Sequence, residues 1–334
     1  MHHYGIRGQI LNWFKSYLTD RTQSVSYGSA VSEKLPIKCG VPQGSILGPI
    51  LFLLYINDLP NVFKSLSCVI FADDASLYLI GANPAQLIMK ANVELDRLLQ
   101  WVRANRLTVN IDKSIYMIHT NRQTNFLPPL FFNFETLKLK TSHKVLGVIV
   151  DNKLTFKQHI QSLCQKLSRS IAMINHVNKL LPINVLKTLY YSYIQSHLTY
   201  CLCIFGSTYP THLLPLFKMQ KKAIRSVTNS AFDAHTGPLF KEHHILNLFD
   251  LIKCEIGTYM FKNKHCDLFH RLNHNYNTRN RENFVNPHHD LTIFEKSLSY
   301  SGPKLWNTLP HDLRNKRSLH SFGKNYKKFL INNS

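Results

Sequence analysis

The chain has 334 residues, 44% of them apolar, which is enough for two or three packed modules with a sizeable core. Its 40 lysines and arginines against 19 acidic residues give a net charge of +21, which favours a nucleic-acid partner, although a basic protein without any polyanion is the alternative on charge alone. The sequence has no ~18-residue apolar run, no signal-peptide pattern and no paired cysteine spacing, which argues against a membrane partner and a zinc ribbon and predicts an intracellular protein.

The first 56 residues alternate helical and strand patterns. Apolar positions at helical spacing predict a helix over residues 6–18, and alternating apolar positions predict a hairpin over residues 22–38. The glycine-rich stretch 40–44 breaks this pattern. Residues 45–56 are almost wholly apolar, so a buried helix is predicted there.

Two short apolar runs, at residues 66–72 and 75–80, flank the pair Asp73-Asp74. This pattern predicts a strand-turn-strand unit with two acids at its tip. The rest of this region is predicted to hold a helix over 84–102, strands at 116–119 and 144–150, and a loop at 121–129. The first 150 residues therefore indicate an α+β module.

The second half of the chain is helical by its apolar period. The predicted helices cover residues 156–180, 183–197, 212–229 and 245–262, with a last helix around 319–331 and a polar loop over 264–290. One of these helices carries a stripe of four basic residues at 3–4 spacing: Lys218, Lys221, Lys222 and Arg225. Such a stripe can meet nucleic-acid phosphates or can simply be a solvated face. The basic cluster at 314–317 is too weak to assign the protein to the nucleus rather than the cytoplasm.

The acidic pair is chemically suggestive because Mg²⁺ takes carboxylate oxygens and substrate phosphates as ligands. In two-metal phosphoryl transfer, ions roughly 4 Å apart serve the attacking hydroxyl and the leaving group. Aspartate is also a common turn residue, so Asp73-Asp74 alone would be read as an ordinary turn.

A second motif lies upstream of the acidic pair. The box at residues 40–49 reads GVPQGSILGP, and its glycines let the backbone approach a nucleotide or template closely. Gln43 offers both a donor and an acceptor, and the helix that follows presents its N-terminus to phosphate.

Together these motifs resemble the reverse transcriptases of non-LTR retrotransposons of the jockey-like type. The resemblance rests on the box at 40–49, the Phe71-Ala72-Asp73-Asp74 box, the pattern from Asn105 to Lys113 and Leu146-Gly147-Val148, in that order. It also includes Tyr276-Asn277-Thr278-Arg279 and residues 300–310 near the end of the chain. It implies an RNA-directed DNA polymerase that uses Mg²⁺, an RNA template, a DNA primer and deoxynucleoside triphosphates.

The resemblance also implies a fold and residue roles. The fold would be part of a right-hand polymerase: a partial palm at 1–152 with the fingers largely missing, a helical thumb-like region at 153–262 and a basic C-terminal extension at 263–334. Asp73 would bind metal, with Asp74 as its supporting neighbour, and Lys113 would protonate the departing pyrophosphate. The substrate and template turn would be Pro42, Gln43, Gly44 and Ser45, the primer grip Leu146, Gly147 and Val148, and the phosphate contacts of the thumb the four basic residues of the stripe.

Simpler interpretations accompany these roles. Lys113 fits a solvated lysine at a strand edge, Gly147 a plain bulge, and Asp58 a capping or loop residue. The family also has another catalytic aspartate on a separate strand, ahead of the helix that here begins near Ile6. Two adjacent aspartates on one turn do not readily bridge two ions, so we expect a truncated copy with little activity alone. The alternative is a nucleic-acid-binding remnant, or a co-opted interaction protein, without catalysis.

Overall fold

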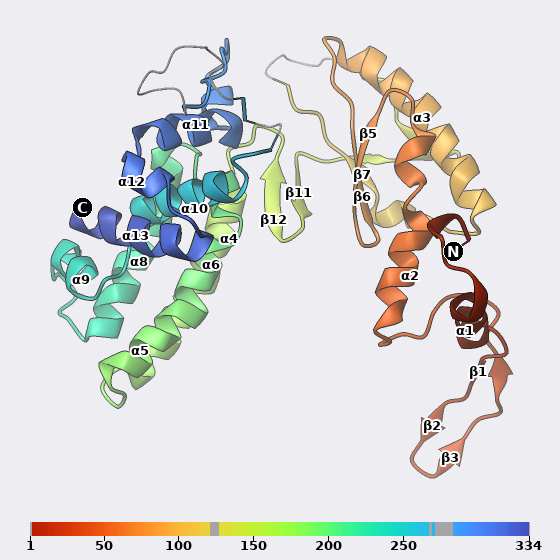
Figure 1. Cartoon of the computed structure of the whole chain (residues 1–334), viewed down its shortest axis with the longest axis horizontal. Helices are drawn as coiled ribbons and strands as arrows, with labels where there is room; N and C mark the ends of the chain where they lie inside the picture. The colour runs from red at the N-terminus through yellow and green to blue at the C-terminus, as the bar shows by residue number, and fades with distance from the viewer. Residues whose placement is uncertain (1, 121–126, 267–268, 271–282, 334) are drawn as a thin grey trace. The chain divides into compact units, whose positions relative to one another are not determined.

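The computed structural model describes residues 2–120, 127–266, 269–270 and 283–333, and the chain divides into two compact units (Figure 1). The N-terminal unit comprises Met1–Ile118 and Arg122–Leu139, and the C-terminal unit comprises His119–Asn121 and Lys140–Ser334. The predicted loop at 121–129 and polar loop at 264–290 lie partly outside the described residues, and the motif at 276–279 lies wholly outside them. No helix in the described part is long and apolar enough to cross a membrane.

The N-terminal unit mixes helices with short strands. Its helices are α1 (Gly8–Leu18), α2 (Leu47–Ile56) and α3 (Pro84–Ala104), with 3₁₀ turns η1 (His2–Tyr4), η2 (Leu59–Val62) and η3 (Ile111–Lys113). Its strands are β1 (Thr22–Gln23), β2 (Ser26–Tyr27), β3 (Ala30–Val31), β4 (Leu35–Pro36), β5 (Ser67–Phe71), β6 (Asp74–Tyr78), β7 (Ile115–Tyr116), β8 (Phe131–Phe132), β9 (Glu135–Thr136) and β10 (Lys138–Leu139). The helices predicted at 6–18 and 84–102 are confirmed. The hairpin predicted at 22–38 is confirmed by the antiparallel pairs β1–β4 and β2–β3.

α3 organises the small core of this unit. Asn83 caps its first turn by accepting a hydrogen bond from the Ala85 N–H at 3.0 Å, and Pro84 occupies the first position, where no N–H is needed. The buried face of α3 packs with the strand region that follows it, through Ile88, Leu95, Leu130, Phe132 and Leu137. This apolar contact holds α3 against β8.

The prediction that residues 45–56 form a buried helix is wrong in one respect. The helix is present as α2, but only Gly48, Leu51 and Ile56 are buried. Ile50 and Leu53 on its other faces are 52% and 50% exposed. A helix that is apolar on every side can be fully buried only when neighbours cover every side. In the described part of the N-terminal unit, neighbouring residues cover only one side of α2.

The C-terminal unit starts with a hairpin and continues with helices. The hairpin is β11 (Ser142–Val145) with β12 (Val148–Asp151), where a single strand at 144–150 was predicted. The helices are α4 (Lys157–Val177), α5 (Ile183–Tyr190), the π-helical turn η4 (Tyr191–Gln195), α6 (Ser196–Thr199), α7 (Leu202–Phe205), α8 (Pro210–Thr228), α9 (Thr236–Glu242), α10 (Leu248–Lys262), η5 (Phe294–Lys296), α11 (Leu298–Thr308), α12 (His311–Arg314) and α13 (Leu319–Asn332). The predicted helical segments are therefore confirmed, with the one at 183–197 divided into α5, η4 and the start of α6.

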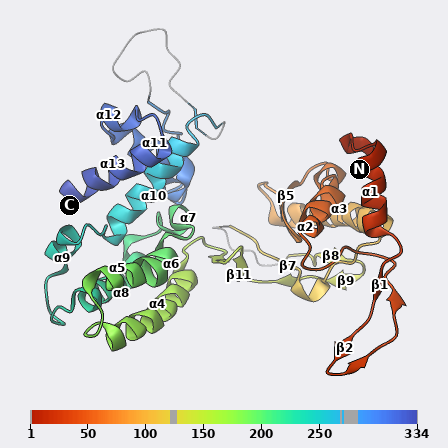
Figure 2. The same ribbon diagram turned by 60° about the horizontal axis from the view of Figure 1, so that its bottom comes forward.

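α10 is central to the packing of the C-terminal unit. Both α11 and α13 contact it, and the three helices lie together in both views (Figure 1, Figure 2). At Gly257 a Cβ atom would lie 2.5 Å from the Tyr326 ring, so only glycine allows α13 to approach this closely. The described part of the predicted extension at 263–334 thus shares one hydrophobic core with α10. Residues 140–152, which the sequence predicted as the end of the palm, belong to the same compact unit as the helices. The division into palm, thumb and extension stays a prediction.

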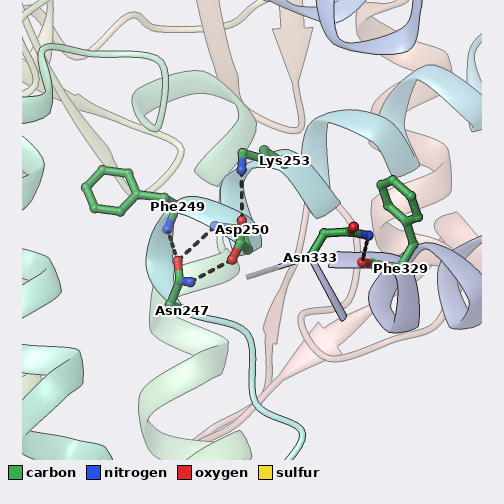
Figure 3. A network of polar contacts seen from close by, with 6 residues as sticks. All are labelled: Asn247, Phe249, Asp250, Lys253, Phe329 and Asn333. Carbon is green, nitrogen blue, oxygen red and sulfur yellow. Dashed lines mark hydrogen bonds and ion pairs between the residues drawn. The ribbon is translucent and has the colours of Figure 1, made fainter. Parts of the chain in front are cut away.

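A polar network fixes the start of α10 (Figure 3). The Asn247 side-chain carbonyl accepts hydrogen bonds from the N–H groups of Phe249 and Asp250 at 3.0 and 3.1 Å. The Asn247 amide donates to Asp250 Oδ2 at 2.6 Å, and Lys253 Nζ contacts Asp250 Oδ1 at 2.9 Å. The first turn thereby satisfies two N–H groups that have no partner within the helix, which sets the residue at which the helix begins.

Candidate active site

The acidic pair lies at the turn of the β5–β6 hairpin, as predicted. Figure 1 shows β5 and β6, which form this hairpin. Phe71 pairs with Asp74 across it, so Ala72 and Asp73 form a two-residue loop. Ala72 has a φ of 52°, in the left-handed region that favours glycine, whereas Asp73 does not. A tight turn of this kind fixes the backbone from which both carboxylates project.

Asp73 and Asp74 are both exposed. No ion pair or side-chain hydrogen bond engages either carboxylate among the described residues, so their oxygens are accessible to an incoming cation. Two carboxylates suit the oxygen chemistry of Mg²⁺. The described part of the chain contains no cluster of three or more acidic, histidine or cysteine residues suited to metal, so the pair fits a share of a Mg²⁺ site and not the whole of one.

The box at residues 42–45 forms a turn that also begins a helix. The Ser45 N–H donates to the Pro42 carbonyl at 3.3 Å, with Gln43 and Gly44 at the centre of the turn. Gly44 has a φ of +81°, which a type II turn requires at this position. Ser45 Oγ accepts from the Gly48 N–H at 3.0 Å and donates to the Pro42 carbonyl at 2.8 Å, so Ser45 links this turn to the first turn of α2. The turn leaves Gln43 exposed, where a template or substrate could meet it.

Lys113 ends the 3₁₀ turn η3. Asn110 caps this turn by accepting from the Lys113 N–H at 3.1 Å, and the side chain of Lys113 is exposed. The placement differs from the strand-edge alternative. No hydrogen bond or ion pair joins Lys113 to Asp73 or Asp74 in the described part of the chain, so its acid role stays a prediction.

A buried carboxylate that the sequence did not reveal supports the entry to β5. Glu94 on α3 is 2% exposed. It accepts hydrogen bonds from the N–H groups of Lys64 and Ser65 at 3.1 Å each, and from the Ser65 hydroxyl at 2.8 Å. Arg97 lies 2.7 Å away on the next turn. Burial acts to raise the pKa of Glu94, but these hydrogen bonds outweigh it and the pKa is lowered.

The predicted primer grip forms the turn of the β11–β12 hairpin. Val145 pairs with Val148, and both central residues have positive φ, 44° at Leu146 and 90° at Gly147. This is the geometry of a type I′ turn, so Gly147 is not a bulge. Tyr200 at the end of α6 donates its hydroxyl to the Leu146 carbonyl at 2.5 Å. A Cβ at Gly147 would lie 3.1 Å from the Tyr200 ring, so Tyr200 covers the turn.

A second carboxylate missed in the sequence joins this hairpin to α4. Asp151 Oδ1 accepts from the N–H groups of Lys153 and Thr155 at 3.1 Å each. Asp151 Oδ2 accepts from the Thr155 hydroxyl at 3.1 Å and from the Phe156 N–H at 2.6 Å. An aspartate at the end of a strand is a known turn signal, and this could have pointed to Asp151.

His159 lies on the first turn of α4 and is buried. Its Nδ1 accepts from the Ile149 N–H at 3.4 Å, and burial and then the charge of Lys166 lower its pKa. Its ring packs edge-on against Phe205, with centroids 4.9 Å apart. This neutral histidine is a core contact between β12 and the helices.

The four basic residues of α8 have different surroundings. Lys218 and Lys222 are exposed. Lys221 Nζ lies 4.5 Å from the centre of the Phe217 ring, and Arg225 Nε donates to the Ala234 carbonyl at 2.9 Å. The stripe is thus partly engaged within the protein.

The candidate residues lie in both units. Asp73, Asp74, Lys113 and the turn at 42–45 belong to the N-terminal unit, whereas the turn at 146–148 and the stripe on α8 belong to the C-terminal unit.

Asp58, left as a capping or loop residue, precedes η2, and its Oδ2 accepts from Trp101 Nε1 at 3.4 Å. That interpretation agrees with the structure.

Comparisons with known proteins agree with the motifs. Residues 1–150 match the family model described as reverse transcriptase (RNA-dependent DNA polymerase). The RNA-directed DNA polymerase from mobile element jockey of Drosophila melanogaster is 27% identical over 257 residues, which are 74% of this chain and 28% of that protein. The probable RNA-directed DNA polymerase from transposon X-element of the same species is 28% identical over 265 residues, which are 77% of this chain and 28% of that protein.

A third relative is the probable RNA-directed DNA polymerase from transposon BS of Drosophila melanogaster, which is 25% identical over 246 residues, 70% of this chain and 27% of that protein. The chain thus spans less than a third of the length of these curated relatives. No solved structure matches it significantly. Residues 1–150 therefore match the reverse transcriptase family model and contain both helices and strands, and 70–77% of the chain is similar to RNA-directed DNA polymerases of mobile elements and transposons.

Proposed function

We propose that the chain is part of an RNA-directed DNA polymerase that extends a DNA primer on an RNA template. The observation that carries this proposal is the acidic turn: two exposed aspartates, Asp73 in the two-residue hairpin loop and Asp74 at the start of β6, within the residues that match the reverse transcriptase family. A rigid turn presents carboxylates in a fixed direction, as nucleotidyl transfer requires. In this interpretation the N-terminal unit contains the palm and the helices after the β11–β12 hairpin act as the thumb.

Asp73 and Asp74 are the residues that would hold Mg²⁺. When bound, such an ion supplies charge neutralisation for triphosphate oxygens and lowers the pKa of an attacking hydroxyl. The pairing of β5 with β6 fixes the backbone from which the two carboxylates project. Glu94 holds the segment just before β5 through its hydrogen bonds to Lys64 and Ser65. Because the described residues contribute no third acid to the pair, we expect this chain alone to polymerise weakly.

The other residues have roles that follow from their positions. Gln43, exposed at the centre of its turn, would contact the template or the incoming nucleotide through its amide. Lys113 would donate a proton to the departing pyrophosphate. The turn at Leu146-Gly147, held by Tyr200, would grip the primer backbone, and Lys218 would meet phosphates of the product duplex.

Primer extension tests the proposal. The purified chain is supplied with a primed RNA template, deoxynucleotides and Mg²⁺, with a chelator as the metal-free control. Weak extension that disappears in Asp73→Asn and with the chelator is expected. The matched control is Asp96→Asn, which removes an equal charge from an exposed position on α3. Extension that survives Asp73→Asn would overturn the assignment of the acidic turn.

A non-catalytic nucleic-acid-binding protein is the second candidate. It is favoured by the net charge of +21 and by the incomplete set of metal ligands among the described residues. This candidate predicts salt-dependent binding of an RNA–DNA duplex, equal in the wild type and Asp73→Asn, together with no extension at any Mg²⁺ concentration. Absence of binding at low salt would reject both candidates.

A further inference from the structure

An open pocket of about 270 Å³ lies on the C-terminal unit, lined by residues of α4, of α8 and of the segment that follows α8. Its size is near the lower end of small-molecule sites, about 300 Å³, which suits one nucleotide rather than a duplex. The lining residues are Ile171 and Phe232 together with the polar residues Asn175, Asn178, Lys222, Arg225, Ser226 and Ser230.

The charged groups of the pocket are all positive. Lys222 is exposed on α8 and has no ion-pair partner within the described residues. Arg225 gives its Nε–H to the Ala234 carbonyl at 2.9 Å, which orients the guanidinium and leaves its terminal nitrogens for another acceptor. No acidic residue lines the pocket. These two cations suit a phosphate, which a fixed arginine binds well.

The amides and the aromatic ring add a second kind of chemistry. Asn178 donates to the Ser226 carbonyl at 3.2 Å, so its amide is held at the pocket wall, and Asn175 stands one turn before it. Phe232 is 85% exposed, the highest fraction among the exposed aromatic residues that the structure describes in the C-terminal unit. Burial of apolar surface does not explain its position, but a flat ring beside cations and amides offers a surface on which a base can stack.

We propose that this pocket binds one unpaired nucleotide of a single-stranded nucleic acid, with its phosphate on Lys222 and Arg225 and its base on Phe232. A duplex would use the cations, but its bases are stacked on each other and would leave Phe232 without a partner. An acidic peptide would likewise use only the cations. The pocket is separate from the acidic turn, and binding there does not depend on polymerase activity.

The test measures binding of a short oligonucleotide that contains the fluorescent base 2-aminopurine, in RNA and DNA versions, and of the same oligonucleotide in a duplex. Phe232→Leu should weaken single-strand binding about tenfold and abolish the change in 2-aminopurine fluorescence that stacking causes. Lys222→Gln should lower the slope of log K against log salt by about 0.7, the value for one phosphate contact of a single strand. The RNA and DNA versions identify which polymer binds more tightly.

Two control variants match these changes. Lys241→Gln removes the same charge from an exposed position on α9, and Phe134→Leu makes the same change at a ring that is 93% exposed in the N-terminal unit. Both should bind as the wild type does. The proposal is overturned if Phe232→Leu binds the single strand as tightly as the wild type does, if it weakens duplex binding as much as single-strand binding, or if inorganic phosphate or polyglutamate competes as well as the oligonucleotide. Primer extension, which depends on Asp73, reports on the polymerase assignment separately.

Discussion

Glu94 on α3 and Ser65 just before β5 are joined by two hydrogen bonds to a single carboxylate oxygen. Oε1 of Glu94 accepts from the Ser65 N–H at 3.1 Å and from its hydroxyl at 2.8 Å. Because β5 leads directly to the acidic turn, this contact connects the helix at the centre of the small core with the strand that carries Asp73.

Replacing Glu94 by Ala should destabilise the N-terminal unit by about 2 kcal/mol, because the Lys64 and Ser65 N–H groups lose a charged acceptor. Its lowered pKa means that the unfolded chain binds the proton more readily, so this contribution is present above the ordinary pKa of glutamate, ~4.3, and lost as the pH falls below it. Glu94→Gln should therefore flatten the acid limb of the stability curve. Urea unfolding between pH 3 and 7 measures both effects, and Asp96→Asn is the exposed control on the same helix.

The turn at Gly44 should show a graded response to substitution. Gly44 has a φ of +81° and open space around its Cβ position, so the cost of a side chain there comes from the backbone and not from collision. Gly44→Ala should cost about 1 kcal/mol, and Gly44→Asn less, because asparagine tolerates the left-handed region. Urea unfolding of the two variants measures these costs. An equal loss of stability in Gly44→Ala and Gly44→Asn would contradict the type II turn.

Gly237→Ala provides the opposite case. Gly237 also has open space around its Cβ position but no positive φ, and it lies in α9. Alanine should be neutral or stabilising there, by up to about 1 kcal/mol, because alanine favours helix more than glycine does. The same change should thus have opposite signs at the two positions.

The turn of the β11–β12 hairpin should depend on Tyr200. Tyr200→Phe removes the hydrogen bond to the Leu146 carbonyl but keeps the ring, and it should cost about 0.5–1 kcal/mol locally. Faster amide hydrogen exchange at Val145 and Val148, which pair next to the turn, with unchanged exchange in α10, would report this. Gly147→Ala should cost more, because it combines a φ of +90° with a Cβ 3.1 Å from the Tyr200 ring. Tyr200→Ala should relieve only the steric part of that cost, which a double-mutant cycle measures.

Close packing at Gly257 predicts a larger effect on the C-terminal unit. Gly257→Ala would place a Cβ 2.5 Å from the Tyr326 ring, and this overpacking should cost about 1–3 kcal/mol. Tyr326→Leu in the same chain should recover part of the loss. Thermal unfolding of the single and double variants distinguishes this collision from a general intolerance of α10 to alanine, which would give no recovery.

The elements that could be predicted from sequence are those with a repeating apolar pattern. The helices around 84–102 and 245–262 and the hairpin around Asp73 have such periods, and the structure contains them. The extent to which α2 is buried could not be predicted from its composition. Apolar residues favour burial, but the sequence of the helix does not say which neighbouring elements cover it. Neither could the hairpin at 142–151, where the Leu146-Gly147 turn interrupts an otherwise continuous apolar run.

The candidate site was predictable to the extent that its residues form local motifs. The acidic pair and the Gly44 turn were found because their residue types carry their chemistry. Glu94, Asp151 and Tyr200 were missed, because each acts on backbone groups, which any sequence has. Glu94 and Tyr200 act on groups 29 and 54 residues away in the chain, and a single sequence contains no signal for such long-range partners.

The four hydrogen bonds of Asp151 have a mechanical consequence. They join the last residue of β12 to the loop after it and to the residues just before α4, so a displacement of the hairpin would be passed to the start of this helix. A strand of nucleic acid that pushed on the Leu146-Gly147 tip would then tilt α4, and α8 packed along it would follow. A force applied at the hairpin would thereby be transmitted to α8, the helix that carries Lys222.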